Sequence, residues 1–187
     1  MAPRPSLQPD PALPRTPPRS ATRSRLAIGR GPGCLTGLLL ALLLWLPAAP
    51  AVAAMDYAKQ VLIGADFHAS DLRGVTFNLT NLREANFAGS DLRNASLFGA
   101  KLQDADFSGA DLREATLDSA VFDGTDLRNA RLDDAFAFNT KFRNVRIEGA
   151  DFTNVPLRGD ALSTLCAVAA GTNPSSGRAT RDTLGCG

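Results

Sequence analysis

Large apolar residues recur at every fifth position through more than half of this 187-residue chain. The series begins at Leu62 and ends at Leu157, and Ala137 is its one small member. Small or short-branched residues form a second series two positions before the large ones, from Ala65 to Val155. An α-helix repeats every 3.6 residues and a strand every 2.0 residues, so neither explains a period of five. The pattern therefore predicts a chain that turns at regular intervals around one narrow interior.

A near-right-angle turn in every five residues closes a four-sided coil in about twenty residues. Stacked coils would pair their backbones about 4.8 Å apart, as neighbouring strands do, and five of them would be roughly 24 Å tall. Residues twenty positions apart would then lie above one another in columns. Two of these columns supply the predicted core ladder: Phe67, Phe87 and Phe107, and Leu72, Leu92 and Leu112. The predicted fold class is an all-β solenoid.

The repeated units resemble those of the pentapeptide-repeat family. The matching units are Ala65-Asp66-Phe67, Ala85-Asn86-Phe87, Ala105-Asp106-Phe107 and Ala150-Asp151-Phe152. This resemblance implies a right-handed quadrilateral β-helix of about five coils over residues 62–159, with short helical caps. Residues 62–67, residues 135–142 and the tail between two cysteines are also similar to the thylakoid lumenal members found in plants, algae and cyanobacteria. Those members have no settled molecular role.

Residues 1–54 are predicted to be a targeting segment that is removed. Its first part is rich in Arg and Pro and has Asp10 as its one acidic residue. A mostly apolar stretch, residues 35–46, is followed by Pro47 and small residues, which is typical of a signal peptide and its cleavage site. Cleavage before Ala54 or Met55 is expected. A retained membrane anchor is the alternative, but a span needs about 20 apolar residues.

The expected subcellular location follows from this segment together with the resemblance. We expect the thylakoid lumen of a chloroplast or cyanobacterium, with the bacterial periplasm as the alternative, and no membrane association after cleavage. Residues 55–187 contain 14 basic and 18 acidic side chains, so their net charge is −4.

Both ends of the solenoid are predicted to carry caps, because an unfinished β-helix exposes its last coil. Residues 55–61 would form the N-terminal cap, with one helical turn at residues 56–59. Residues 160–187 would form the C-terminal cap: a helix over 160–170, a turn at 173–177 and a returning tail. The tail brings Cys186 towards Cys166, and two cysteines in an exported chain favour a disulfide. A redox-switched bond and two free thiols are the alternatives.

Three phenylalanines form a candidate face for a protein partner. Phe98 and Phe138 have the same outward position in the repeat, with Asp118 between them, and Phe136 lies next to Ala137. Exposed together, they would make an apolar patch. In the alternative, the chain bulges at Ala137 and one phenylalanine turns inward to fill the space that the small side chain leaves.

Another face carries stacked charges. Aspartates and arginines alternate there at twenty-residue spacing: Asp71, Asp91 and Asp111 beside Arg73, Arg93 and Arg113. Like charges that are stacked in one column repel, and the neighbouring column of opposite charge offsets this. We interpret the face as a solvated neutral ladder, with a binding stripe for a charged partner as the alternative.

These features predict a non-catalytic protein that binds an unidentified protein partner, in the assembly or maintenance of photosynthetic complexes. The chain has one histidine, His68, and offers no constellation for catalysis, a metal or another cofactor. A monomer is favoured and nucleic acid is not expected as a partner. One alternative is a redox-responsive lumenal protein switched through Cys166 and Cys186. The other is a DNA mimic that occupies a topoisomerase, which would need a strongly acidic surface.

Overall fold

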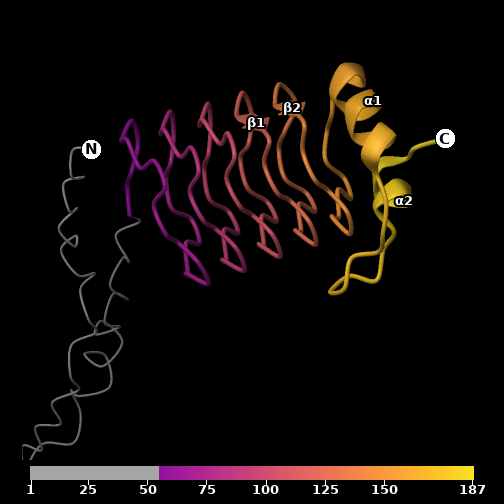
Figure 1. The fold of residues 1–187 in the computed structure, drawn as a ribbon, viewed down its shortest axis with the longest axis horizontal. Helices are drawn as coiled ribbons and strands as arrows, with labels where there is room; N and C mark the ends of the chain where they lie inside the picture. Colours follow the sequence, from indigo (N-terminus) through magenta and orange to yellow (C-terminus); the bar gives the residue numbers. More distant parts are fainter. Residues whose placement is uncertain (1–54) are drawn as a thin grey trace, which may run out of the picture. The chain divides into compact units, whose positions relative to one another are not determined.

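The computed structural model describes residues 55–187, and the predicted targeting segment lies outside this range. The chain winds into a stack of four-sided coils, and two helices cover the last coil (Figure 1). Parallel bridges join residues twenty positions apart, for example Asp66 with Asn86 and Asn86 with Asp106. Two short strands, β1 (Val121–Asp123) and β2 (Lys141–Arg143), pair in the same parallel register. The predicted twenty-residue coil is therefore present.

The two inward series fill the interior of the coils. The predicted ladder residues Phe87, Phe107, Leu92 and Leu112 have no solvent exposure and Leu72 has 3%. Phe67 is half-buried because it lies in the first coil, and its ring stacks on Phe87 with centroids 4.9 Å apart. The small series is almost entirely buried as well, because the interior has no room for larger groups. The buried apolar residues form one cluster between Leu72 and Leu184, so residues 55–187 contain their own complete core.

Most corners are tight turns, in which a backbone N–H returns to the carbonyl oxygen three residues earlier. At the first predicted corner, Ala65 N–H donates to Leu62 O at 3.3 Å. The third residue of the turn has a positive φ, as in a type II turn, and glycine or asparagine is preferred there. Leu79 occupies one of these positions with φ 58°. It is the one large apolar residue among the positive-φ residues of the described range.

The N-terminal end differs from the predicted helical cap. Residues 56–60 form another side of the first coil: Asp56 bridges to Thr76, and Tyr57 N–H donates to Thr76 O at 2.7 Å. The Asp56 carboxylate accepts the Ala58 N–H at 2.8 Å, the same local contact that Asp66 makes with the N–H two residues on. Tyr57 stacks on Phe77 with centroids 5.2 Å apart. The prediction was wrong because Tyr57 continues the five-residue series by one more position.

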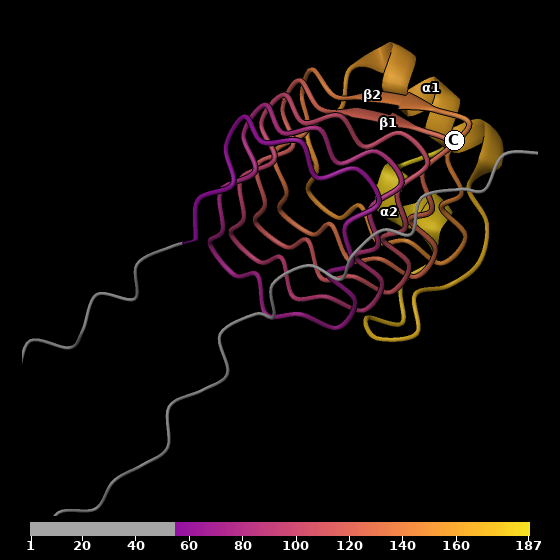
Figure 2. The same cartoon turned by 60° about the vertical axis from the view of Figure 1, so that its left-hand side comes forward.

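The C-terminal cap consists of two helices joined by a hook (Figure 2). Helix α1 (Gly159–Val168) buries Ala161 and Leu165, and it ends two residues before the predicted end at residue 170. Residues 172–179 form the hook, which is closed by an antiparallel bridge between Thr172 and Ala179. Helix α2 (Thr180–Leu184), which the sequence did not predict, follows and buries Leu184. The cap as a whole covers the last coil, where the inward columns end.

Ala137 causes no bulge. Phe136 N–H donates to Ala115 O at 2.9 Å, and Leu117 N–H donates to Phe136 O at 2.8 Å, so Phe136 keeps the same backbone pairing as its equivalents in the earlier coils. Ala137 stays fully buried, while Phe136 and Phe138 both point outward. The alternative in which a phenylalanine turns inward is therefore wrong, because the backbone pairing fixes which residues face the core.

Candidate functional site

One side of the β-helix gathers large apolar side chains on its surface. This side is built from residues 76–80, 96–100, 116–120 and 136–140, which bridges align from Thr76 through Phe136. Its exposed apolar residues are Leu79 at 53%, Phe98 at 42%, Phe136 at 52% and Phe138 at 48%. We call these four residues the apolar face. Patches of this kind on soluble proteins mark interaction sites more often than isolated exposed residues do.

Leu79 joins the three phenylalanines that the sequence predicted as a partner face. Its N–H donates to Phe98 O at 2.8 Å, and its side chain lies over Gly99, where an added Cβ would come within 2.7 Å of it. Sequence reasoning missed Leu79 because a corner position is normally judged by turn preference. The available signal was a large apolar residue at a place in the repeat where glycine and asparagine are preferred.

Asp118 lies between Phe98 and Phe138 in the same surface column, and its carboxylate is held by hydrogen bonds. Its carboxylate accepts the Asn139 N–H at 2.9 Å and the Ser119 hydroxyl at 3.2 Å. The carboxylate is thereby tied to its own coil and to the next one, and the flanking phenylalanine side chains remain exposed.

A depression of about 590 Å³ begins where the apolar face turns the corner after residue 138. It lies between the coil that carries β2 and the start of α1. Its polar lining includes Ser119, Asn139, Lys141, Arg143, Arg158 and Asp160. Arg158 and Asp160 lie 3.8 Å apart, whereas Lys141 and Arg143 form no ion pair with any residue of the range 55–187. The corner next to the apolar face therefore carries two cations that have no ion-pair partner among the described residues.

The charged ladder on another face is satisfied internally. Each arginine pairs with the aspartate two residues before it at 2.6 Å, and Arg73 and Arg93 also approach the aspartate of the next coil at 3.6 and 3.7 Å. Hydrogen bonds from Arg73 lower the pKa of Asp71 to about 2. A ladder whose charges are already paired has little left to offer a charged partner.

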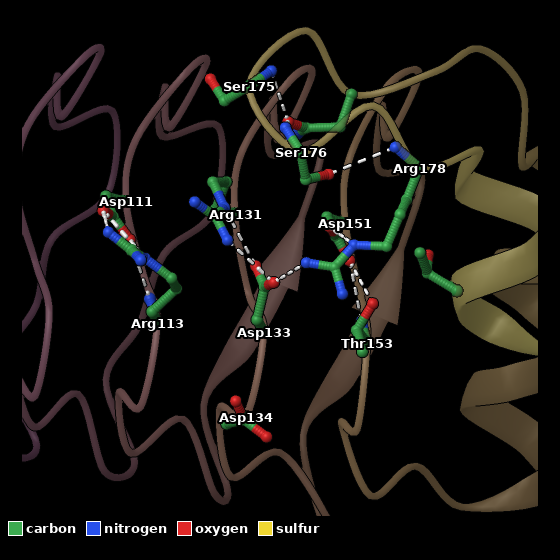
Figure 3. Close-up of polar contacts among 12 residues, drawn as sticks. Asp111, Arg113, Arg131, Asp133, Asp134, Asp151, Thr153, Ser175, Ser176 and Arg178 are labelled. Atoms are coloured by element: carbon green, nitrogen blue, oxygen red, sulfur yellow. Dashed lines mark hydrogen bonds and ion pairs between the residues drawn. The ribbon is translucent and has the colours of Figure 1, made fainter.

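The ladder reverses in the fourth coil, where Arg131 occupies the aspartate column and Asp133 the arginine column. This exchange receives the C-terminal tail: Arg178 pairs with Asp133 and lies 2.9 Å from Asp151 on the next coil (Figure 3). Arg131 pairs with Asp133 from the other side at 2.9 Å. The reversed step is thus a docking point for the tail of the same chain.

The tail has further attachments. Cys166 and Cys186 are joined in a disulfide with an S–S distance of 1.99 Å. The Asn173 side chain is fully buried, and its amide donates to the carbonyl oxygens of Asn129, Ala130 and Gly149. Both cysteines are half-buried. The disulfide is therefore one of several contacts that hold the cap against the coil.

The described residues do not meet the requirements of a metal site or of a membrane-spanning helix. His68 is exposed, and its backbone N–H donates to the Asp66 carboxylate. No group of three or more His, Cys, Asp or Glu in the range 55–187 is arranged to hold a metal ion. Among the described helices, none has the length and apolar character to cross a bilayer.

Comparison with known proteins identifies the family. The sequence pattern of the family described as Pentapeptide repeats matches residues 61–99 and 95–134. A crystal structure of a pentapeptide repeat protein from the Arabidopsis thaliana thylakoid lumen is 47% identical, covers 69% of this chain and 90% of that chain, and superposes with a TM-score of 0.68.

Two further relatives match over shorter stretches. The thylakoid lumenal 15 kDa protein 1, chloroplastic, of Arabidopsis thaliana is 62% identical over 37 residues, which are 20% of this chain and 16% of that relative. A pentapeptide repeat protein from the cyanobacterium Cyanothece is 30% identical over 55% of this chain and 64% of its own length, with a TM-score of 0.27. The twenty-residue coil, the burial of both inward series and the extended match to a lumenal relative lead to one conclusion: this chain belongs to the pentapeptide-repeat family and folds as its right-handed quadrilateral β-helix.

Proposed function

We propose that this chain is a non-catalytic protein of the thylakoid lumen, whose β-helix presents the apolar face to a protein partner during assembly or maintenance of photosynthetic complexes. The observation that carries the proposal is the apolar face itself: four large apolar side chains, each 42 to 53% exposed, on one side of a rigid solenoid. The signal-peptide pattern in residues 1–54 and the similarity to a lumenal protein support the compartment.

Leu79 gives this interpretation a second, energetic support. A non-glycine residue with positive φ costs about 1–2 kcal/mol relative to the right-handed region. Asparagine tolerates that conformation better, and it occupies the equivalent corner position at Asn94. The Leu79 side chain is 53% exposed, so burial in the core does not explain a large apolar residue at this corner. Its apolar character distinguishes it from other residues with positive φ, such as Glu84 and Glu114, and is a reason to expect a role at the surface.

The test is a crosslinking pull-down of residues 55–187 from thylakoid lumen and membrane extracts. The Phe136→Ser/Phe138→Ser variant is compared with wild type and with Val61→Ser/Ile63→Ser, which removes two exposed apolar side chains from a different face. We expect one photosynthetic complex to be enriched by wild type and by the control, and to be lost with the phenylalanine variant. Equal recovery with all three proteins, or no specific complex with any of them, would contradict the proposal.

A further inference from the structure

The apolar face and the basic depression form one continuous surface around a corner of the β-helix. Phe138 is the last residue of the apolar face, and Asn139 and Lys141 line the depression immediately after it. Strand β2 places Lys141 and Arg143 on the next side of the coil, both exposed. A ligand that rests on Phe136 and Phe138 therefore lies next to these two cations.

The cations at this corner are free to receive a ligand. Two carboxylates of the neighbouring coil form no ion pair with them: Asp118 accepts from Asn139 N–H, and Asp123, which is the strand partner of Arg143, accepts from the Asn144 side chain at 2.9 Å. In the ladder, at the tail and around Asp126, by contrast, arginines pair with aspartates at 2.6 to 3.0 Å.

The positive charge at the corner also stands out against the rest of the protein. Residues 55–187 carry a net charge of −4. The depression nevertheless brings Lys141, Arg143 and Arg158 together, with Asp160 as the one acidic residue in its lining and Asp123 beside Arg143 on the neighbouring strand. A local field of this sign attracts a negatively charged partner and orients its approach. Charge complementarity therefore selects an acidic ligand.

We propose that this corner binds an acidic segment of the partner protein, with a carboxylate in the depression and a neighbouring apolar side chain on Phe136 and Phe138. The inference rests on the proposed function and names the chemistry of the partner at the same site. A guanidinium and an ammonium group suit a carboxylate, which can accept hydrogen bonds from both. The cations line a depression of about 590 Å³, and a protruding peptide side chain can enter it more readily than a flat bilayer surface can.

The experiment uses isotope-labelled residues 55–187, which contain a complete core. The probe is a terminally blocked peptide with two acidic residues followed by leucine and phenylalanine. A matched peptide carries the two corresponding amides, and binding is followed through backbone amide resonances. We expect the acidic peptide to shift the resonances of residues 136–143 and 158–161. The dissociation constant should be about tenfold higher for the amide peptide, because the charge interaction is missing.

Charge reversal supplies the decisive comparison. Lys141→Glu/Arg143→Glu should raise the dissociation constant of the acidic peptide by about tenfold or more, and added salt should weaken wild-type binding. Arg83→Glu/Lys101→Glu is the matched control: it changes one lysine and one arginine in the same two surface columns, both exposed and without ion pairs in the described range. This control should bind like wild type.

Several results would overturn the inference. The two peptides could bind equally well, or both charge-reversed proteins could bind like wild type. Sedimentation could show a wild-type dimer that becomes a monomer only in Lys141→Glu/Arg143→Glu. The corner would then bind a second copy of the chain. Flotation with phosphatidylglycerol vesicles could show that wild type binds the vesicles, that Lys141→Glu/Arg143→Glu does not, and that no peptide is bound. The occupant would then be a lipid surface. If the pull-down recovers a complex that Lys141→Glu/Arg143→Glu still binds, the acidic-segment inference fails while the proposed function stands.

Discussion

The Nε of Arg178 lies 2.9 Å from an oxygen of Asp151, whose side chain has no solvent exposure. The same guanidinium pairs with Asp133, which is also buried. One arginine of the tail thus compensates two carboxylates on successive coils. Removing one partner of a buried pair leaves the other charge desolvated without compensation, which is more costly than losing an exposed ion pair.

Arg178→Ala should therefore destabilise the protein clearly. We expect a loss of about 2–3 kcal/mol in the free energy of unfolding, which is less than the roughly 3–5 kcal/mol for a fully buried pair, because Arg178 is partly exposed and Arg131 still pairs with Asp133. Denaturant unfolding measures this loss. Arg73→Ala is the control, since Arg73 and Asp71 are both exposed, and its effect should be much smaller. Equal losses for the two variants would mean that the tail does not depend on the reversed step of the ladder.

The ladder predicts how stability changes with pH. Side-chain hydrogen bonds from Arg73 and Arg93 lower the pKa of Asp71, to about 2, and of Asp91. In an unfolded chain an aspartate has a pKa of about 3.9. A carboxylate whose pKa is lower in the folded state contributes its full stabilisation at a pH above the unfolded pKa. This contribution is lost as the pH falls through the folded pKa.

The melting temperature should therefore stay nearly constant from about pH 7 to about pH 5 and fall below about pH 4. Asp71→Asn/Asp91→Asn should start from a lower melting temperature and lose less of it in the acidic range. Calorimetry across this series provides the measurement. A steep decrease between pH 7 and pH 5 would instead point to a group whose pKa is raised on folding.

The disulfide is expected to stabilise the cap without controlling its position. Cys166→Ser/Cys186→Ser should lose about 3 kcal/mol, as the chain-entropy model gives for a loop of this length. Its far-ultraviolet circular dichroism should nevertheless match that of wild type, because Asn173 and Arg178 continue to hold the tail. Release of the tail in this variant, seen as rapid proteolysis of residues 160–187, would favour the redox-responsive alternative.

Asn173→Ala tests those remaining contacts separately. The substitution removes the side-chain donor from the carbonyl oxygens of Asn129 and Gly149, whereas Ala130 O keeps its bond from Asp151 N–H. We expect a loss of about 2 kcal/mol, because buried polar groups without partners retain their desolvation penalty. Hydrogen exchange of residues 171–179 should accelerate in this variant. Unchanged exchange would show that the disulfide alone holds the hook.

Leu79→Asn should separate stability from binding. Asparagine adopts positive φ more readily than leucine. The free energy of unfolding of the variant should therefore be about 0.5 kcal/mol higher than that of wild type, despite the lost contact with Gly99. Recovery of the partner complex should fall at the same time, because the apolar face loses one of its four members. Reduced stability together with unchanged recovery would mean that Leu79 serves the fold.

Leu112→Asp tests the core ladder. Leu112 is fully buried in the third coil, and an aspartate there would place an unpaired charge in a narrow apolar interior. We expect the Leu112→Asp protein to be unfolded at room temperature and to show no cooperative unfolding transition on heating. Leu112→Met, which keeps the volume and the apolar character, should cost less than about 1.5 kcal/mol. A folded Leu112→Asp protein with a normal melting curve would contradict the assigned inward register.

The fold could be predicted because one constraint, burial, acts on every fifth residue. A single displaced core residue would expose an apolar side chain, so the register from Leu62 to Leu157 was readable from the pattern. The same twenty-residue spacing placed Phe98 and Phe138 in one surface column. Whether Phe136 pointed outward depended on the backbone hydrogen bonds at Ala115 and Leu117, which no side-chain pattern encodes.

The cap was less predictable, because its contacts are particular and not periodic. Helix α2 is only five residues long, and a helix of that length depends on its tertiary contacts. One of those contacts is the Thr183 hydroxyl, which accepts the Phe152 N–H at 3.1 Å. The pairing of Arg178 with Asp133 spans 45 positions. The basic depression was missed for the same reason, since Arg158 and Lys141 line one depression only once α1 folds over the coil.

The β-helix also has two different repeat periods. Its interior repeats every five residues, whereas each surface column repeats every twenty. An insertion of five residues in a corner after Phe98 would return every later core residue to the inside, yet it would rotate the following surface by a quarter turn. Phe138 would then leave the side occupied by Phe98, although the fold could persist. Sequence length changes in such a chain can therefore be silent for folding and disruptive for recognition, and only whole-coil changes of twenty residues preserve both.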